Sequence, residues 1–387
     1  MTNARISAQI AFLKEADRLK QVDRSNVLLD LSRPENSAEH SWHLALYALI
    51  FAPMAGRDVS LDRVIRMLLL HDLVEIDVGD HPIHEAVDWD DVAKREQLAA
   101  RRIFGLLPDD QAAEYLALWT EFEADETPDA QFAKMLDRSQ PLFQVLYAPA
   151  PLPDHLQIVR DNLASGRAAY LQQACPEIYW HAKNLLGKAD AAETGLVPQW
   201  LTFLAEADQL KSIYRASRLI DDSRFENSAE HSWHIMLYAM VLADQAGQDV
   251  QIDRVLRMLL IHDIVEIDAG DAPIHGQVDH AAMAAKEEAA AERLFGLLPQ
   301  NQYQDLHRLW HEFEGAETPD AQFAKSVDRV QTPIANLENG GGSWVEYNVT
   351  LEQIDQRVGV PVKRGAPDLW AWLRPQLLAH FDKLQTA

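Results

Sequence analysis

The chain has little cysteine, a deficit of basic residues and no long apolar run. Its 387 residues include one cysteine, Cys175, so a disulfide within the chain is excluded. Lys and Arg number 35 against 60 Asp and Glu, and the resulting formal charge of −25 would repel a phosphate backbone, so we expect no nucleic-acid partner. No apolar run approaches the roughly 20 residues of a membrane span, and the N-terminal segment lacks the apolar core of a signal peptide. We therefore expect a cytoplasmic protein that has no membrane partner.

Two common signatures of nucleotide and ester chemistry are also missing. The sequence contains neither the GxxxxGK[ST] phosphate loop nor the GxSxG elbow. Its content of 48% hydrophobic and 25% charged residues is typical of folded globular domains and excludes a disordered, collagen-like or coiled-coil chain. What the sequence does contain is a repeat.

The chain is a tandem duplication with an offset of 191 residues. ENSAEHSWH occupies residues 35–43 and returns at 226–234, and RMLLLHDLVEIDVGDHPIH at 66–84 returns with few changes at 257–275. The register holds without a gap from FLKEAD through the DR that ends at residue 138 of the first copy. Such self-similarity over most of the chain indicates two copies of one structural unit.

After that shared part, the two copies diverge. The first copy continues into the proline-rich YAPAPLPDH at 147–155, whereas the second continues into ENGGGSW at 338–344. We place the domain boundary near residue 190, in GKADAAETG, which gives a first domain at 1–190 and a second at 191–387.

Each half is predicted to be helical, because apolar residues recur at three- and four-residue steps and alternating β-branched runs are scarce. Gly79, Asp80 and Pro82 should end the helix that carries His71 and Asp72. The fold class expected is all-α. Helix-start signals occur at Asn36, Asp88 and Thr127 and again at Asn227, Asp279 and Thr318.

Each half also carries a histidine, a His-Asp pair and a later aspartate that could surround one metal ion. In the first half these are His40, His71 with Asp72, and Asp137. Two imidazoles and two carboxylates suit a divalent transition metal, Mn, Co, Ni, Fe or Zn, better than an all-oxygen cage, with Mg as an outlying candidate. A single His-Asp pair is more often a buried, internally bonded polar pair, but four potential ligands repeated at one spacing favour a metal. The second set is His231, His262, Asp263 and Asp328.

Two further acidic residues lie near each proposed metal ligand set. Glu75 follows Asp72 by three residues and His71 by four, so it shares their helical face. Its apolar neighbours favour a raised pKa and a role as general acid or base, against the alternative of a surface carboxylate. Asp80 either positions a water or substrate hydroxyl or serves the turn after Gly79. The second copy keeps both residues, as Glu266 and Asp271.

Several basic residues are placed to meet an anionic substrate, although solvation at the surface is the competing interpretation. Lys134 and Lys325 precede the last aspartates by three residues and either bind phosphate or pair with a neighbouring acid. His43, three residues after His40, is expected to be a packed residue and not a ligand. The arginines proposed to bind substrate are Arg24, Arg33, Arg215 and Arg224.

Taken together, these motifs resemble the HD-domain superfamily of metal-dependent phosphohydrolases, whose pattern is H…HD…D. SRPENSAEHSWH, LLLHDLVEIDVGD and FAKMLDR are most similar to the branch that contains the HD-domain 5'-deoxynucleotidases and their bacterial relatives. The resemblance covers residues 10–140 and 200–375, nearly the whole chain. It implies two all-helical HD-domain bundles related by pseudo-two-fold symmetry.

The resemblance also implies roles for the residues named above. One divalent metal would be held in each half by the four His and Asp residues of that half, with Glu75 and Glu266 as the catalytic glutamates and Asp80 and Asp271 as the second acidic residues. The sequence departs from the deoxynucleotidases at one point, because their substrate-contacting Arg is followed by Trp, whereas Arg24 is followed by Ser25.

The activity implied is release of phosphate from a small phosphomonoester, with a (deoxy)nucleoside 5'-monophosphate as the leading substrate. The alternatives are another HD-type hydrolase, acting on a triphosphate or cyclic nucleotide, and a non-catalytic metal- and nucleotide-binding sensor. Complete acidic sets in both halves argue against the sensor. Members of this branch commonly dimerise, so the tandem could form an intramolecular pseudo-dimer, with further association into a homo-oligomer left open.

Overall fold

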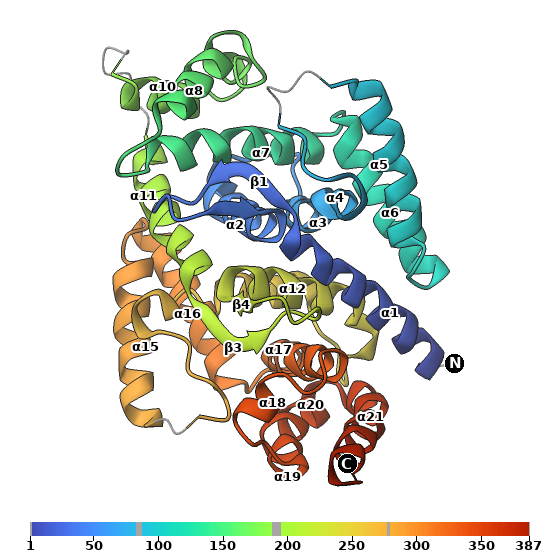
Figure 1. The fold of residues 1–387 in the computed structure, drawn as a ribbon. Helices are drawn as coiled ribbons and strands as arrows, with labels where there is room; N and C mark the ends of the chain where they lie inside the picture. Colours follow the sequence, from blue (N-terminus) through green and yellow to red (C-terminus); the bar gives the residue numbers. More distant parts are fainter. Residues whose placement is uncertain (1, 83–86, 188–194, 277–278, 387) are drawn as a thin grey trace.

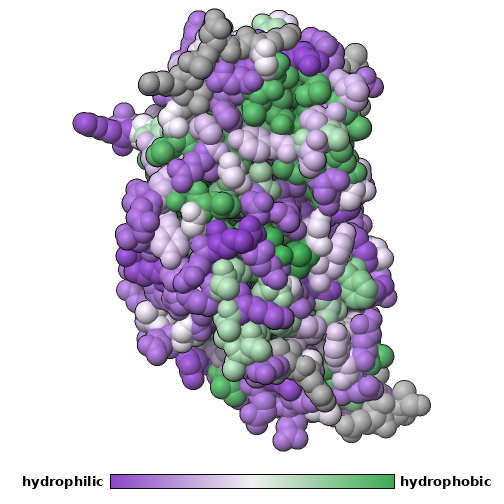
Figure 2. Space-filling view, turned by 90° about the vertical axis from the view of Figure 1, so that its left-hand side faces the viewer, coloured by the Kyte–Doolittle hydropathy of each residue, from purple (hydrophilic) through white to green (hydrophobic). Residues whose placement is uncertain are grey.

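The computed structural model describes residues 2–82, 87–187, 195–276 and 279–386. Helices dominate both halves, as the sequence predicted, and the first half lies above the second in Figure 1. The domain boundary proposed near residue 190 falls outside the described residues. None of the described helices is long and apolar enough to cross a membrane, and the face shown in Figure 2 is mainly hydrophilic with separate apolar groups.

The first half runs from α1 to α10. Its elements are α1 (Thr2–Ala16), η1 (Asp17–Gln21), β1 (Asp23–Val27), β2 (Pro34–Asn36), α2 (Ser37–Phe51), η2 (Ala52–Met54), α3 (Leu61–Leu70), η3 (His71–Val74), α4 (Glu75–Val78), α5 (Trp89–Phe104), α6 (Asp109–Ala124), α7 (Pro128–Leu146), α8 (Pro153–Ser165), α9 (Leu171–Ala174) and α10 (Pro176–Leu185).

The second half repeats this order up to its long α17. Its elements are α11 (Val197–Ala207), η4 (Asp208–Ser212), β3 (Tyr214–Arg218), β4 (Phe225–Asn227), α12 (Ser228–Val241), η5 (Ala243–Gln245), α13 (Ile252–Ile261), α14 (Glu266–Ala269), α15 (His280–Phe295), α16 (Gln300–Gly315), α17 (Pro319–Glu338), α18 (Ser343–Glu346), α19 (Leu351–Ile354), η6 (Asp355–Gly359), α20 (Val360–Gly365) and α21 (Pro367–Thr386).

All six predicted helix starts are confirmed. Asn36 accepts a hydrogen bond from the Glu39 backbone N–H, and the Glu39 side chain accepts one from the Asn36 backbone, which completes a capping box. The same box forms at Asn227 and Glu230 in the second half. The side chains of Asp88, Thr127, Asp279 and Thr318 also accept from backbone N–H groups of the first turn.

Two local features differ from the expectation of helices throughout. Each half contains a short antiparallel hairpin after its first helix, β1 with β2 and β3 with β4, and the second strand leads directly into the capped α2 or α12. In addition, α3 ends at Leu70, and His71 begins a tight 3₁₀ turn instead of continuing the α-helix. A 3₁₀ turn has three residues per turn, so His71 and Asp72 leave the α-helical register of α3.

The two halves are joined by reciprocal contacts. Helix α2 packs against α12, while α1 packs on α12 and α11 packs on α2 (Figure 1). The Trp42 indole donates to the backbone oxygen of Leu260 at 3.1 Å, and the Trp233 indole donates to that of Leu69 at 3.1 Å. Both tryptophans are fully buried. Contacts that are exchanged in this way between equivalent positions are characteristic of an isologous interface.

Beyond α7 and α17 the halves are built differently. Helices α8 to α10 cover the first half, whereas α18 to α21 cover the second. Gly341 and Gly342, in the GGGSW segment, have positive φ angles of 118° and 42°, a region that disfavours residues with a Cβ atom. The segment therefore forms a turn that leads into α18.

Candidate metal centres

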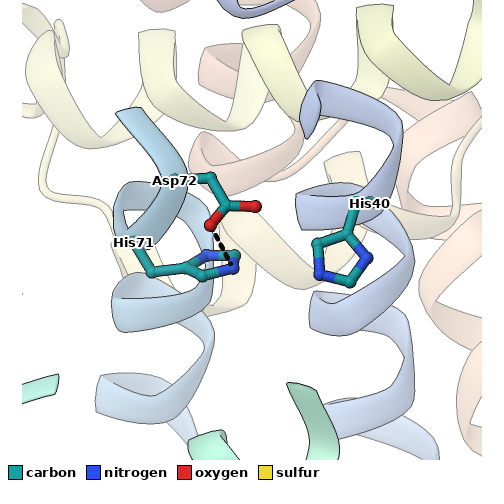
Figure 3. A group of neighbouring side chains, drawn as sticks. All are labelled: His40, His71 and Asp72. Carbon is teal, nitrogen blue, oxygen red and sulfur yellow. Dashed lines mark ion pairs between the residues drawn. The ribbon is translucent and has the colours of Figure 1, made fainter. Parts of the chain in front are cut away.

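The structure brings the first set of predicted ligands together near the N-terminal end of α2. His40 Nε2 lies 3.2 Å from Asp137 Oδ1, which reaches it from α7. His71 Nε2 lies 3.0 Å from Asp72 Oδ1 in the turn after α3. Figure 3 shows the rings of His40 and His71 facing the same space, with the Asp72 carboxylate above it. Ligand atoms of His40, His71 and Asp72 all lie within 4.8 Å of one another.

The second half repeats this arrangement. His231 Nε2 lies 3.2 Å from Asp328 Oδ1, and His262 Nε2 lies 2.9 Å from Asp263 Oδ1. Ligand atoms of His231, His262 and Asp328 also lie within 4.8 Å of one another. Matching distances at positions 191 residues apart indicate that one geometry is maintained twice.

The unpaired ring nitrogens fit a metal ion. The buried Nδ1 atom of His71 lies 2.8 Å from the Leu68 backbone oxygen, which requires the proton on Nδ1 and leaves Nε2 as the lone-pair donor. That buried Nε2 makes no hydrogen bond, and neither does His262 Nε2. His262 Nδ1 is anchored in the same way to Leu259 at 2.8 Å. Unsatisfied buried lone pairs aimed at carboxylates are what a divalent cation would complete.

The aspartates are held as carboxylates. Burial opposes the ionisation of Asp72, but the adjacent His71 ring and the positive charge of Arg24 outweigh burial and lower its pKa. Burial likewise opposes the ionisation of Asp137, and its hydrogen bond with His40 contributes to lowering the pKa. The same balance lowers the pKa of the second pair, Asp263 and Asp328.

Glu75 differs from these aspartates in its tendency to keep a proton. Burial, followed by the negative charge of Asp72, raises the pKa of Glu75 well above its usual range. Its carboxyl accepts a hydrogen bond from Ser37 Oγ, at the first residue of α2. Burial also raises the pKa of Asp80. In the second half, Ser228 Oγ donates to Glu266 at 2.6 Å, and burial raises the pKa of both Glu266 and Asp271.

Arg24 from β1 faces these acids. Its guanidinium donates to Asp72 Oδ2 at 2.9 Å and lies 3.8 Å from both Glu75 and Asp80. Arg215 from β3 repeats the contact with Asp263 at 2.9 Å. Each hairpin thus places one arginine at the edge of one cluster.

Arg33 and Arg224 lie elsewhere, so the geometry gives no support to the prediction that they bind phosphate. Arg33 pairs with the buried Glu39 and donates to the Lys211 backbone oxygen of the second half at 2.7 Å. Arg224 pairs with Glu230 and donates to the Lys20 backbone oxygen at 2.7 Å. Because these guanidinium groups are engaged between the halves, we assign them to the interface.

The remaining predicted residues have partners of their own. Lys134 pairs with Glu123 at 2.8 Å and Lys325 with Glu314 at 2.9 Å, so both bind a neighbouring acid. His43 is buried, and its Nε2 lies 3.0 Å from the backbone oxygen of Leu204. The expectation of a packed histidine is therefore confirmed.

Sequence reasoning missed Glu35, the residue before the Asn36 cap, and its counterpart Glu226. Glu35 is fully buried with Oε2 3.5 Å from His40 Nδ1, and Glu226 Oε2 lies 3.3 Å from His231 Nδ1. The available signal was the identical ENSAEHSWH segment, in which this glutamate is retained in both copies.

A cavity opens beside each cluster, and the two cavities differ in size and walls. The first has a volume of about 230 Å³ and runs from Arg24 and Asp80 to the apolar side chains of Leu142, Val145 and Ile158. The second has a volume of about 90 Å³ and is lined by Arg215, Asp271, Asp328, Trp344, Tyr347 and Val358, among others. The smaller volume follows from the different covering helices, because α18 brings Trp344 to the second cavity.

A family model described as "HD domain" matches residues 16–179 and again residues 207–370. The chain therefore belongs to the HD-domain family, and both the predicted resemblance and the tandem are confirmed. The human 5'-deoxynucleotidase HDDC2 is 31% identical over 136 residues, which cover 35% of this chain and 65% of that protein, just under two thirds of its length. Its mouse counterpart is 33% identical over 138 residues, covering 35% of this chain and 67% of that protein.

A solved structure is similar as well. It is the crystal structure of a predicted metal-dependent phosphohydrolase from Magnetospirillum magnetotacticum MS-1, with 44% sequence identity and a TM-score of 0.47. The match covers 49% of this chain and 94% of that one.

Proposed function

We propose that each half of the chain is a metal-dependent centre that releases phosphate from a small phosphomonoester, with a (deoxy)nucleoside 5'-monophosphate as the substrate class. The observation that carries this proposal is the repeated cluster of two histidines, ionised aspartates and a protonatable glutamate beside one arginine. The 5'-deoxynucleotidase relatives support the choice of substrate class.

The first centre would hold its metal with His40, His71, Asp72 and Asp137, and the second with His231, His262, Asp263 and Asp328. When bound, a divalent metal supplies Lewis acidity toward a phosphoryl oxygen and lowers the pKa of water. The donor set of imidazole and carboxylate favours Mn, Fe, Co, Ni or Zn.

Glu75 would move the proton in the first centre. Its raised pKa lets the carboxyl hold a proton that an ordinary glutamate would have lost, and Ser37 fixes one of its oxygens so that the other faces the cluster. Asp80, also with a raised pKa, lies across Arg24 from it. Glu266 and Asp271 would serve the second centre in the same way.

Arg24 and Arg215 would bind the substrate phosphate. Each guanidinium stands between a predicted metal ligand and the adjacent cavity, so it can pair with a phosphoryl oxygen while remaining close to the aspartate. The apolar walls of the first cavity, including Leu142 and Val145, would contact the nucleoside.

We further propose that the two halves of one chain pack together as an intramolecular pseudo-dimer. The reciprocal tryptophan contacts, from α2 to α13 and from α12 to α3, bury equivalent surfaces of the two halves against each other. A solution mass near 43.7 kDa is expected for such a pseudo-dimer, and a clearly larger mass would show further association.

The direct test is phosphate release from a panel of ribo- and deoxynucleoside monophosphates by metal-stripped protein, with Mn, Co, Ni, Zn or Mg added back separately. Metal-dependent release of phosphate is expected. Bound metal without release from any monophosphate would reject the monophosphatase assignment and favour a different phosphoester or a binding function.

A further inference from the structure

A buried lysine crosses from each half into the other. Lys211, in η4 of the second half, is fully buried, and its Nζ donates to Glu35 Oε1 of the first half at 2.7 Å. Lys20, in η1 of the first half, is equally buried and donates to Glu226 Oε1 of the second half at 2.7 Å. Each lysine thus reaches the glutamate that sequence reasoning missed.

The other oxygen of each glutamate faces a predicted metal ligand. Glu35 Oε2 lies 3.5 Å from His40 Nδ1, and Glu226 Oε2 lies 3.3 Å from His231 Nδ1. A carboxylate at the ring nitrogen opposite the metal is the usual device that fixes the orientation of a ligating histidine. The chain of contacts therefore runs from the ammonium of one half, through a carboxylate, to the imidazole of the other half.

The lysines also explain two clusters that would otherwise resemble cation sites. Glu35, His43 and Asp208 lie close enough to hold an ion, and so do the equivalent residues of the second half. Lys211 Nζ lies within this first cluster, 2.9 Å from His43 Nδ1 and bonded to Asp208. The ammonium supplies the positive charge that these buried acids require.

The two carboxylates do not depend equally on their lysines. Glu226 also accepts from Gln331 at 2.9 Å and from Ser217 at 3.1 Å. The positions equivalent to Ser217 and Gln331 in the first half are Asn26, which donates to a backbone oxygen, and Gln140, which bonds within its own helix. Glu35 therefore relies on Lys211 for its short hydrogen bond.

We propose that Lys211 and Lys20 are positioning residues that act across the interface, each holding the carboxylate that orients the metal-binding histidine of the other half. The inference rests on the metal centres proposed above. It adds that neither centre is complete within its own half, and that the first centre depends more strongly on its partner.

The test uses chains that keep one centre and that also carry Glu288→Gln, His307→Leu and His311→Thr, which remove a further candidate metal cluster on α15 and α16. Asp263→Ala leaves the first centre, and Asp72→Ala leaves the second. In the Asp263→Ala chain, Lys211→Met should weaken Co²⁺ binding, followed by titration of its visible absorption, by roughly 10- to 100-fold. Lys20→Met is the matched control, because it removes an equally buried lysine that contacts the other centre, so Co²⁺ affinity should stay within about twofold.

In the Asp72→Ala chain the two lysines should exchange roles, with a smaller loss for Lys20→Met because Gln331 and Ser217 still hold Glu226. Lys211→Arg, which keeps the charge, should recover part of the affinity lost by Lys211→Met. If the Lys211→Met chain does not fold, the double variant Glu35→Gln/Lys211→Met replaces it. This variant has no buried charge at position 35 and should show the same loss of Co²⁺ affinity.

Equal losses from both lysines, or a larger loss from the lysine of the same half, would overturn the inference. Absence of Co²⁺ binding in the unsubstituted single-centre chains would instead reject the proposed metal centres, so the two failures are distinguishable.

A second observation independently suggests a separate metal site on the second half. His307 and His311 lie one turn apart on α16, and their Nε2 atoms lie 3.2 and 3.3 Å from the same oxygen, Oε1 of Glu288 on α15. Ligand atoms of the three residues lie within 4.8 Å of one another. The equivalent residues of the first half are Gln97, Leu116 and Thr120, which cannot form such a site.

We infer that these three side chains bind a divalent transition metal, because two imidazoles at i and i+4 with one carboxylate give three ligands and leave positions for solvent. The bound metal would link α15 to α16 at the surface. The inference does not depend on the proposed function.

The test is Zn²⁺ titration of an untagged Asp72→Ala/Asp263→Ala chain, in which one equivalent should bind and raise the melting temperature. Adding Glu288→Gln, His307→Leu and His311→Thr, the residues of the first half, should remove both effects. Failure of the double variant to bind Zn²⁺, or unchanged binding after the three substitutions, would overturn this site.

Discussion

His40 in the first half and His231 in the second lie at the same distance, 3.2 Å, from their aspartates, yet the cavities beside them measure about 230 and 90 Å³. The clusters sit on helices whose packing surfaces are shared with the interface, where a shift would disturb buried polar contacts in both halves. One side of each cavity is built from equivalent positions, such as Arg24 and Arg215, whereas the other side comes from α8 in the first half and from α18 in the second, which share no register. The comparison indicates that the two halves retained the geometry of the clusters while part of the cavity walls diverged.

The support beneath the clusters differs as well. Glu226 is held by Lys20, Gln331 and Ser217, whereas Glu35 receives its short hydrogen bond from Lys211. Equivalent ligand geometry can therefore rest on unequal surroundings. A variant that removes both centres should have the largest effect, and variants that distinguish one centre from the other should have smaller effects.

Asp72→Ala together with Asp263→Ala should have the largest effect. Both centres lose a carboxylate ligand, so, once Glu288→Gln, His307→Leu and His311→Thr have removed the surface site, Mn²⁺ binding and phosphate release should fall to background while the circular dichroism of the helices is retained. Metal analysis and a phosphate assay provide the measurement. Undiminished turnover in this variant would contradict the assignment of both centres.

Glu75→Gln in the Asp263→Ala chain should lower kcat by about 10²- to 10⁴-fold, the range for loss of a general acid or base. Because the pKa of Glu75 is raised, its carboxylate prevails only above that raised value, so a reaction that needs the carboxylate should speed up as pH rises through it. The glutamine variant should lose that limb of the pH–rate profile. An unchanged profile would show that another group controls the proton.

The same group gives a stability prediction for the metal-free chain. A carboxyl whose pKa is higher when folded than when unfolded stabilises the fold at low pH, and this contribution is lost as pH rises through the folded pKa. The stability of the Glu75→Gln chain relative to the parent should therefore be greater at pH values above that pKa than at pH values below it. Urea midpoints across the acid-to-alkaline range would measure the difference, and parallel curves would contradict it.

Arg24→Ala and Arg33→Ala should separate substrate binding from assembly. Arg24→Ala in the Asp263→Ala chain should raise KM roughly 10- to 100-fold, the cost of losing a charged hydrogen bond to phosphate. Arg33→Ala should leave KM unchanged but reduce stability by about 3 kcal/mol, because it strands the buried Glu39. Steady-state kinetics and urea unfolding would distinguish them, and a raised KM for Arg33→Ala would restore its role at the phosphate.

The smallest effect concerns substrate size. The chain with the first centre alone should prefer purine over pyrimidine monophosphates more strongly than the chain with the second centre, by about tenfold in relative kcat/KM. Tyr347→Ala, at a partly exposed wall of the second cavity, should narrow the gap. Identical preferences in the two chains would mean that the cavity walls do not select the substrate.

Much of this architecture could be predicted from local sequence. The caps at Asn36 and Thr127 are determined within a few residues, and the apolar periodicity of helices is a local property, so these predictions were confirmed. The His-Asp pair was expected on a continuous helix, but the chain tightens into a 3₁₀ turn there. Propensity does not reveal that local change.

Long-range contacts could not be predicted in this way. Arg33 and Arg24 were equally plausible anion binders in sequence, and only the fold shows that one faces the cluster and the other the interface. Lys211 and Glu35 are 176 residues apart and have ordinary neighbours in sequence. Their pairing depends on how two copies dock, which no spacing within either copy encodes.

The central claim is that two metal-dependent phosphohydrolase centres operate in one chain. Its most direct test is to titrate metal-stripped protein carrying Glu288→Gln, His307→Leu and His311→Thr with Mn²⁺ while phosphate release from deoxynucleoside monophosphates is followed. We predict that release grows with bound metal and saturates at about two ions per chain, one for each cluster. Saturation of both clusters without release of phosphate, or release that proceeds without metal, would contradict the account.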